Sequence, residues 1–171
     1  LERNTAFHVT MRDGVRIALD LWLPEDLGAD ETIPTMVRGT RYWRAMEIVN
    51  PTMFGAEDVN EVEADSWNNH GFAFIVFDVR GSGASFGDRD GPWAEEEVAD
   101  YGEIVDWIVE QPWSDGIVSA IGVSYDGNVA ELFAAQEREA VIAVAPQFAD
   151  FDPYLDIANP GGVFNQGFVG D

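Results

Sequence analysis

The sequence contains no cysteine and no lysine, and its only histidines are His8 and His70. The absence of cysteine excludes disulfides, thiolate metal sites and a cysteine nucleophile. All nine basic residues are arginines, scattered singly among 32 acidic residues, and the formal net charge is −23. Nucleic acids and anionic membranes attract proteins through clusters of lysine and arginine. We therefore expect neither a nucleic-acid partner nor a membrane partner.

Long apolar runs are also missing. No segment approaches the roughly 20 apolar residues that are needed to span a bilayer, and residues 1–4 show no apolar signal-peptide core. We expect a soluble protein, and a cytoplasmic location is favoured over secretion. The first residue is leucine rather than methionine, which indicates a processed or trimmed chain.

No pattern in the sequence calls for a cofactor or a metal. The acidic residues Asp88, Asp90, Asp150 and Asp152 suggest calcium as an alternative, but their spacing does not match the Asp-x-Asp-x-Asp-Gly loop. The acidic excess is better explained as a solvated surface. With 171 residues, 46% of them hydrophobic, the chain has the size and composition of one globular domain.

Hydrophobic periodicity predicts an opening hairpin followed by alternating strands and helices. Residues 15–23 alternate apolar and polar side chains, which is typical of a strand, and the Asp13-Gly14 turn before them favours a hairpin with residues 6–11. Apolar runs predict further strands at 35–38, 72–79, 117–122 and 141–145, the last being buried, and helices at 56–69, 94–111 and 128–136. This order predicts an α/β fold with a mostly parallel sheet and helices on both faces.

A serine stands at a junction between a predicted strand and a predicted helix. The segment reads Gly122-Val123-Ser124-Tyr125-Asp126-Gly127, similar to the nucleophile elbow in which a sharp turn projects the serine hydroxyl above the sheet. Asp126 occupies the place of the second glycine, so the match is incomplete. The alternative is that Ser124 is an ordinary helix N-cap.

Four more motifs accompany the serine motif in a fixed order. The five are Met11-Arg12-Asp13-Gly14-Val15 with Leu21-Trp22-Leu23-Pro24; Thr40-Arg41-Tyr42-Trp43-Arg44; Asp78-Val79-Arg80-Gly81-Ser82-Gly83-Ala84-Ser85-Phe86-Gly87; the serine motif; and Ala145-Pro146. In these motifs the sequence resembles the α/β-hydrolase family that contains cocaine esterase, X-prolyl dipeptidyl peptidase and α-amino-acid ester hydrolases (CocE/NonD type). That family places tyrosine after the nucleophile and glycine at the third position beyond it, which accounts for Asp126.

The resemblance implies roles for three residues. Ser124 would be the acylated nucleophile, and the Tyr125 backbone N–H and the Tyr42 side-chain hydroxyl would form the oxyanion hole. For Tyr42 the alternative is an aromatic ring packed among its neighbours. The glycine-rich segment 78–87 is interpreted as a tight loop that Asp78 and Arg80 brace. Residues 1–147 would be the amino-terminal part of the catalytic domain, and residues 148–171 the start of a helical cap.

The sequence does not supply a catalytic base at the predicted site. His70 precedes its strand and lies at the amino edge of the sheet, whereas Ser124 lies at the carboxyl edge, roughly 20 Å away across a strand. His8 lies in the hairpin, several strands from the elbow. In α/β-hydrolases the chain order is Ser, Asp or Glu, then His, so both partners are expected beyond residue 171. The chain is therefore expected to be an incomplete part of the enzyme that is inactive or nearly so on its own.

These observations predict a serine hydrolase that cleaves ester, amide or peptide bonds of a small-molecule substrate through an acyl-enzyme at Ser124. A non-catalytic α/β-hydrolase-like binding or scaffold module is the alternative. The last strand would leave an unpaired edge, which predicts association with the remainder of the hydrolase chain or with a second copy. Aromatic residues of the last segment either line an acyl pocket or pack against that remainder: Phe148, Phe151, Tyr154, Phe164 and Phe168.

Overall fold

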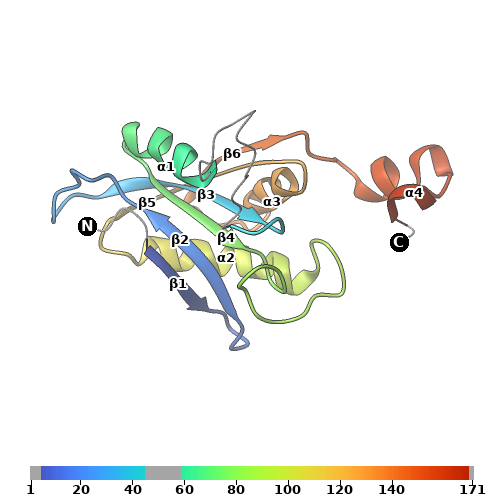
Figure 1. Ribbon diagram of the computed structural model, residues 1–171, viewed down its shortest axis with the longest axis horizontal. Helices are drawn as coiled ribbons and strands as arrows, with labels where there is room; N and C mark the ends of the chain where they lie inside the picture. Colours follow the sequence, from blue (N-terminus) through green and yellow to red (C-terminus); the bar gives the residue numbers. More distant parts are fainter. Residues whose placement is uncertain (1–4, 45–58, 170–171) are drawn as a thin grey trace, which may run out of the picture.

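The computed structural model describes residues 5–44 and 59–169, which form a six-stranded sheet in the order β1-β2-β4-β3-β5-β6 (Figure 1). β1 (Thr5–Thr10) and β2 (Arg16–Trp22) form an antiparallel hairpin, and β2 also pairs antiparallel with β4 (Ala73–Asp78). The remaining pairs are parallel and involve β3 (Ile33–Thr40), β5 (Ser114–Val123) and β6 (Val141–Gln147). The parallel strands therefore end at one edge, where the elbow lies.

Helices cover both faces of this sheet. The central strands carry apolar side chains on both faces, and these side chains are buried under the helices. On one face α2 (Glu95–Val109) and α3 (Tyr125–Ala134) pack against the larger core cluster, which includes Phe77, Ile104 and Phe133. On the other face α1 (Val59–Asn69) covers a smaller cluster around Trp22 and Phe74. The predicted fold class, a mostly parallel sheet covered on both faces after an opening hairpin, is confirmed.

Two features differ from the expectations, and one expectation lies outside the described residues. The segment before Val59 lies outside the described residues, so the predicted start of the first helix at residue 56 is not described. α3 begins at Tyr125 instead of residue 128, directly after the candidate nucleophile. The prediction that strand 141–145 is buried is wrong: β6 is an edge strand whose Ile142 side chain is 64% exposed, since its outer side has no strand partner among the described residues.

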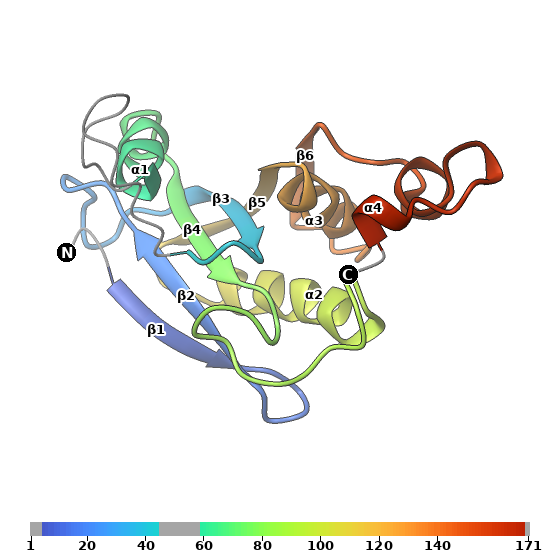
Figure 2. The ribbon, with the colours of Figure 1, turned by 45° about the vertical axis from the view of Figure 1, so that its right-hand side comes forward.

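After β6 the chain extends beyond the sheet, past α3 (Figures 1 and 2). This segment holds a π-helical turn, η1 (Tyr154–Ala158), a 3-10 turn, η2 (Pro160–Gly162), and the short helix α4 (Gln166–Val169). Its assignment as the start of a cap stays a prediction. Within the described ranges, no helix has the length and apolar character needed to cross a membrane.

Candidate active site

Ser124 lies in a sharp turn between β5 and α3. Its backbone has φ 60° and ψ −123°, a conformation that a serine adopts only when the surrounding structure holds it there. The Ser124 N–H donates a hydrogen bond of 2.9 Å to the Gln147 carbonyl at the end of β6, which ties the turn to the neighbouring strand. The structure therefore places Ser124 at the carboxyl edge of the parallel strands, in a sharp strand-to-helix turn that we call the elbow.

Two glycines permit this turn. A Cβ on Gly122 would lie 2.1 Å from the Asp126 carbonyl oxygen and 2.2 Å from its carbon, and a Cβ on Gly127 would lie 2.6 Å from the Gln147 oxygen. All of these atoms are backbone and cannot rotate away. Small residues are thus required because strand and helix approach one another here.

Gly122→Ala is expected to destabilise the complete protein by about 1–3 kcal/mol, since the added methyl group forces the elbow backbone to shift. The measurement is the urea midpoint of unfolding. Gly91→Ala is the matched control, because nothing lies within 4 Å of a Cβ at that position. Equal midpoints for the two variants would show that the elbow is looser than described.

The Tyr125 backbone N–H is the first of helix α3, and no group among the described residues accepts a hydrogen bond from it. At a helix N-terminus the unpaired N–H groups and the helix dipole favour negative charge. This N–H can therefore stabilise an oxyanion that forms beside Ser124.

The Tyr125 side chain is held in a buried network below the elbow. Its hydroxyl donates to Glu97 and accepts from the Arg89 guanidinium at 2.9 Å, and its ring stacks on Trp93 with centroids 4.8 Å apart. Glu97 is 0% exposed and also accepts from the Tyr101 hydroxyl at 2.5 Å. Burial, followed by the charge of Glu97, raises the pKa of Tyr125, so this phenol stays neutral and serves as an anchor.

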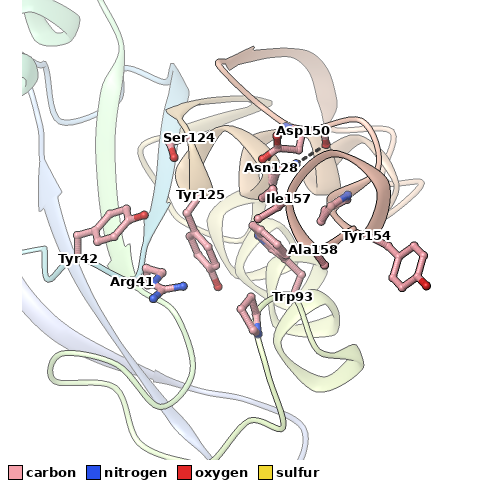
Figure 3. Close-up of a pocket in the computed structure, with 12 residues that line it drawn as sticks. Arg41, Tyr42, Trp93, Ser124, Tyr125, Asn128, Asp150, Tyr154, Ile157 and Ala158 are labelled. Atoms are coloured by element: carbon pink, nitrogen blue, oxygen red, sulfur yellow. Dashed lines mark hydrogen bonds between the residues drawn. The ribbon is translucent and has the colours of Figure 1, made fainter. Parts of the chain in front are cut away.

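Tyr42 lies across from the elbow on the chain that leaves β3. Its backbone N–H donates to the Thr40 hydroxyl at 3.0 Å, and its ring meets the Tyr125 ring edge-on with centroids 6.2 Å apart. Figure 3 shows the ring extending toward the elbow that carries Ser124. The structure thus brings the three predicted site residues, Ser124, Tyr42 and Tyr125, into one place.

The three residues line a cavity of about 500 Å³ (Figure 3). Of the aromatic residues of the last segment, Tyr154 lines the cavity, whereas Phe148 and Phe151 are 88% and 93% exposed and do not. The sequence reasoning missed several members of this wall, which come from the loop before α2, from α3 and from the last segment: Arg41, Pro92, Trp93, Asn128, Asp150, Pro153, Ile157 and Ala158.

The segment 78–87 is a braced loop, as interpreted from the sequence. The Asp78 carboxylate accepts from the Arg44 N–H at 2.7 Å and from the Ala84 N–H at 2.9 Å. Arg80 forms two hydrogen bonds with Asp100, at 2.8 and 2.6 Å. Neither Asp78 nor Arg80 lines the cavity, and their hydrogen bonds hold the loop.

Asp126 is buried beneath the elbow, with 9% of its surface exposed and one carboxyl oxygen unpartnered among the described residues. Burial raises its pKa to about 7, against the opposing effects of the Arg38 charge and of a hydrogen bond from Thr40, and Glu63 raises it further. Because the folded state binds this proton more tightly than the unfolded state, Asp126 destabilises the fold increasingly as pH rises from 3.8 to about 7.

Asp126→Asn is therefore expected to stabilise the complete protein above pH 7 by on the order of 2–4 kcal/mol, and by much less at pH 5. The urea midpoints at pH 5 and pH 8 measure this. Asp13→Asn is the control: Arg80 lowers the Asp13 pKa to about 2, so its stabilisation is lost only below pH 4 and its substitution should act equally at pH 5 and pH 8. An Asp126→Asn effect that is the same at both values contradicts the prediction.

The structure brings neither histidine to the site. The His8 ring on edge strand β1 bonds to the Ala84 carbonyl at 3.1 Å, and the His70 ring, at the amino end of β4, bonds to the Ser66 carbonyl at 2.7 Å. Neither lines the cavity. In the described part of the chain, no group of three or more His, Cys, Asp or Glu residues could hold a metal ion.

A mostly parallel sheet with helices on both faces, and a sharp strand-to-helix turn at the carboxyl edge of its parallel strands, is the arrangement of an α/β-hydrolase fold. The model of the X-Pro dipeptidyl-peptidase (S15) family matches residues 13–170, and the chain belongs to this family. The resemblance drawn from the five ordered motifs is thereby confirmed.

The chain is similar to longer proteins. It is 45% identical over 168 residues to a Mycobacterium tuberculosis protein named as a serine esterase, covering 94% of this chain and 27% of that protein. It is 33% identical over 158 residues to cocaine esterase of a Rhodococcus species, covering 92% and 25% of the two chains. A CocE/NonD family hydrolase from Staphylococcus aureus shares the fold with a TM-score of 0.75 at 24% identity, covering 90% of this chain and 29% of that one. The chain thus spans about a quarter of the curated relatives' length.

Proposed function

We propose that the complete protein is a serine hydrolase that cleaves ester, amide or peptide bonds through an acyl-enzyme at Ser124. The observation that carries the proposal is the strained Ser124 backbone, at φ 60° and ψ −123°, at the head of α3 beside a cavity that Tyr42 also lines. A strained backbone conformation persists only where surrounding contacts hold it in place, and such conformations are concentrated at functional sites.

In the proposed reaction the Ser124 hydroxyl oxygen attacks the substrate carbonyl, and negative charge develops on the carbonyl oxygen. The Tyr125 N–H and the Tyr42 hydroxyl donate hydrogen bonds to that oxygen. Collapse of the tetrahedral intermediate expels the alcohol or amine and leaves Ser124 acylated. Water then releases the acid and restores the serine hydroxyl.

The proton that leaves Ser124 requires a base, and neither histidine of this chain lies at the site. His8 and His70 do not line the cavity, and the sequence has no lysine for a Ser–Lys pair. We assign the base to a histidine, supported by an Asp, in the part of the complete protein that follows residue 171. The relatives' greater length supports this assignment.

The same remainder would cover the surfaces that this chain leaves open. β6 exposes its outer edge, and Phe148 and Phe151 are 88% and 93% exposed. A further strand beside β6, from the same chain or a second copy, would satisfy the edge, and a cap that begins at residue 148 would bury the phenylalanines.

The experiment is labelling of the complete protein with a fluorophosphonate probe, followed by peptide mapping. Modification of Ser124, lost in Ser124→Ala, is expected. Modification of a different serine would overturn the assignment. A complete protein that reacts nowhere and turns over no activated ester would instead support the non-catalytic binding or scaffold module.

A further inference from the structure

The cavity beside Ser124 contains an arginine that forms no ion pair with a described residue. Arg41 lines the cavity, and its guanidinium carbon lies 5.6 Å from the centroid of the Tyr42 ring and 5.2 Å from that of Tyr125. Figure 3 shows the guanidinium between the two tyrosines, on the side of the cavity that carries the elbow. Both rings belong to residues that we place in the oxyanion hole.

Ion pairing is otherwise the rule for arginine in this acidic chain. Six arginines within the described ranges contact a carboxylate at 4 Å or less: Arg12, Arg38, Arg44, Arg80, Arg89 and Arg138. Arg41 and Arg16 have no such contact with a described residue. Arg16 stacks on the Phe86 ring, 4.4 Å from its centroid, and does not line the cavity.

Among the described residues, the other charged side chains near the cavity form no ion pair with Arg41. Arg89 is paired with the buried Glu97 at 3.2 Å. Asp150 also lines the cavity, and its backbone is held by Asn128, whose side-chain amide donates to the Asp150 carbonyl at 2.7 Å. In Figure 3 Asp150 lies next to Asn128, whereas Arg41 lies beside Tyr42, on the other side of Tyr125.

Given the proposed function, on which this step rests, we propose that Arg41 binds a carboxylate of the substrate, so that the complete enzyme prefers esters or amides that carry negative charge near the scissile bond. A guanidinium offers two parallel N–H donors that match a carboxylate. Its cation–π contacts with the two tyrosine rings favour its position in the cavity, which reduces the rotamer entropy that binding would otherwise cost. The carboxylate belongs either to the acyl group or to the leaving group.

Matched esters distinguish the two sources. For the acyl group the pair is 4-nitrophenyl hemisuccinate and 4-nitrophenyl butyrate, after subtraction of the uncatalysed rates. For the leaving group the pair is 4-butyryloxybenzoate and 4-butyryloxybenzamide. The measured quantity is the ratio of kcat/KM for the anionic ester to that for the neutral ester, which is independent of the folded fraction of a preparation.

Arg41→Gln is expected to lower this ratio by roughly 10- to 100-fold in the arm that carries the recognised carboxylate, as for loss of a charge-assisted hydrogen bond. Arg41→Lys should keep part of the preference, because the charge remains without the bidentate geometry. Arg16→Gln is the control, a ring-stacked arginine outside the cavity, and should leave both ratios and the basal activity unchanged.

Two results overturn the inference. The first is a ratio of kcat/KM values for Arg41→Gln that equals the ratio for the unmodified enzyme with both ester pairs. The second is a preference of the unmodified enzyme for the cationic 4-nitrophenyl 4-aminobutyrate over the anionic hemisuccinate. In either case Ser124 labelling by the fluorophosphonate remains, so the proposed function stands. Loss of labelling together with turnover of none of the esters identifies failure of the proposed function itself.

Discussion

Ser124→Ala is expected to lower kcat of the complete protein by about 10⁵- to 10⁶-fold, as for removal of the nucleophile from other serine hydrolases. The substitution deletes the attacking oxygen and leaves the rest of the site in place. The remaining activity, carried by the oxyanion donors and by substrate binding, should still exceed the reaction in water. Steady-state hydrolysis of an activated ester, with burst-phase measurement of the acyl-enzyme, tests this.

Ser114→Ala provides the matched control. Ser114 is the first residue of β5, at the opposite end of the strand from Ser124, and its hydroxyl accepts a 3.2 Å bond from the Gly116 N–H. The Ser114→Ala variant should hydrolyse the ester at nearly the rate of the unmodified protein. If Ser124→Ala retains a burst of product equal to the enzyme concentration, the nucleophile is a different residue.

The sequence was sufficient to predict those elements whose apolar pattern has a clear period. Alternation over residues 15–23 matches β2, and the Asp13-Gly14 turn matches its hairpin with β1. The elbow was predictable because Gly122 and Gly127 stand where strand and helix backbones approach most closely. In both cases the signal is local, so it can be read without knowing the rest of the fold.

The parts that were missed depend on contacts between distant segments. Glu97 fits the first turn of a helix, where an acidic residue is normally solvated and favoured by the dipole. Instead it is buried against Tyr125, 28 residues away, and the only local signal was Tyr101 one helical turn later. Asp126 likewise matched a sequence motif, but its burial between the elbow and Arg38 is set by how α3 docks on β3.

The exposure of β6 illustrates the same limit. Its residues are apolar enough for an interior strand, and the pattern alone predicts burial on both faces. The position at the edge of the sheet follows from the strand order, which no single segment encodes. We therefore expect the apolar residues of β6 to be covered by another part of the complete protein.

The Tyr42 hydroxyl can be tested separately from its ring. Tyr42→Phe removes one hydrogen-bond donor and keeps the edge-on contact with the Tyr125 ring, 6.2 Å between centroids. Since an oxyanion donor acts mainly in the transition state, kcat is expected to fall by about 10²- to 10³-fold with little change in KM. Steady-state kinetics over a range of ester concentrations separates the two parameters.

Tyr125→Phe is the matched comparison, because it also deletes one phenol but keeps the backbone N–H that we place in the oxyanion hole. The lost hydroxyl leaves Arg89 and the buried Glu97 short of one partner, so the cost should fall on thermal stability more than on kcat. If Tyr42→Phe lowers kcat no more than Tyr125→Phe does, the Tyr42 hydroxyl does not contact the oxyanion. Its ring would then serve only to pack against Tyr125 and Arg41.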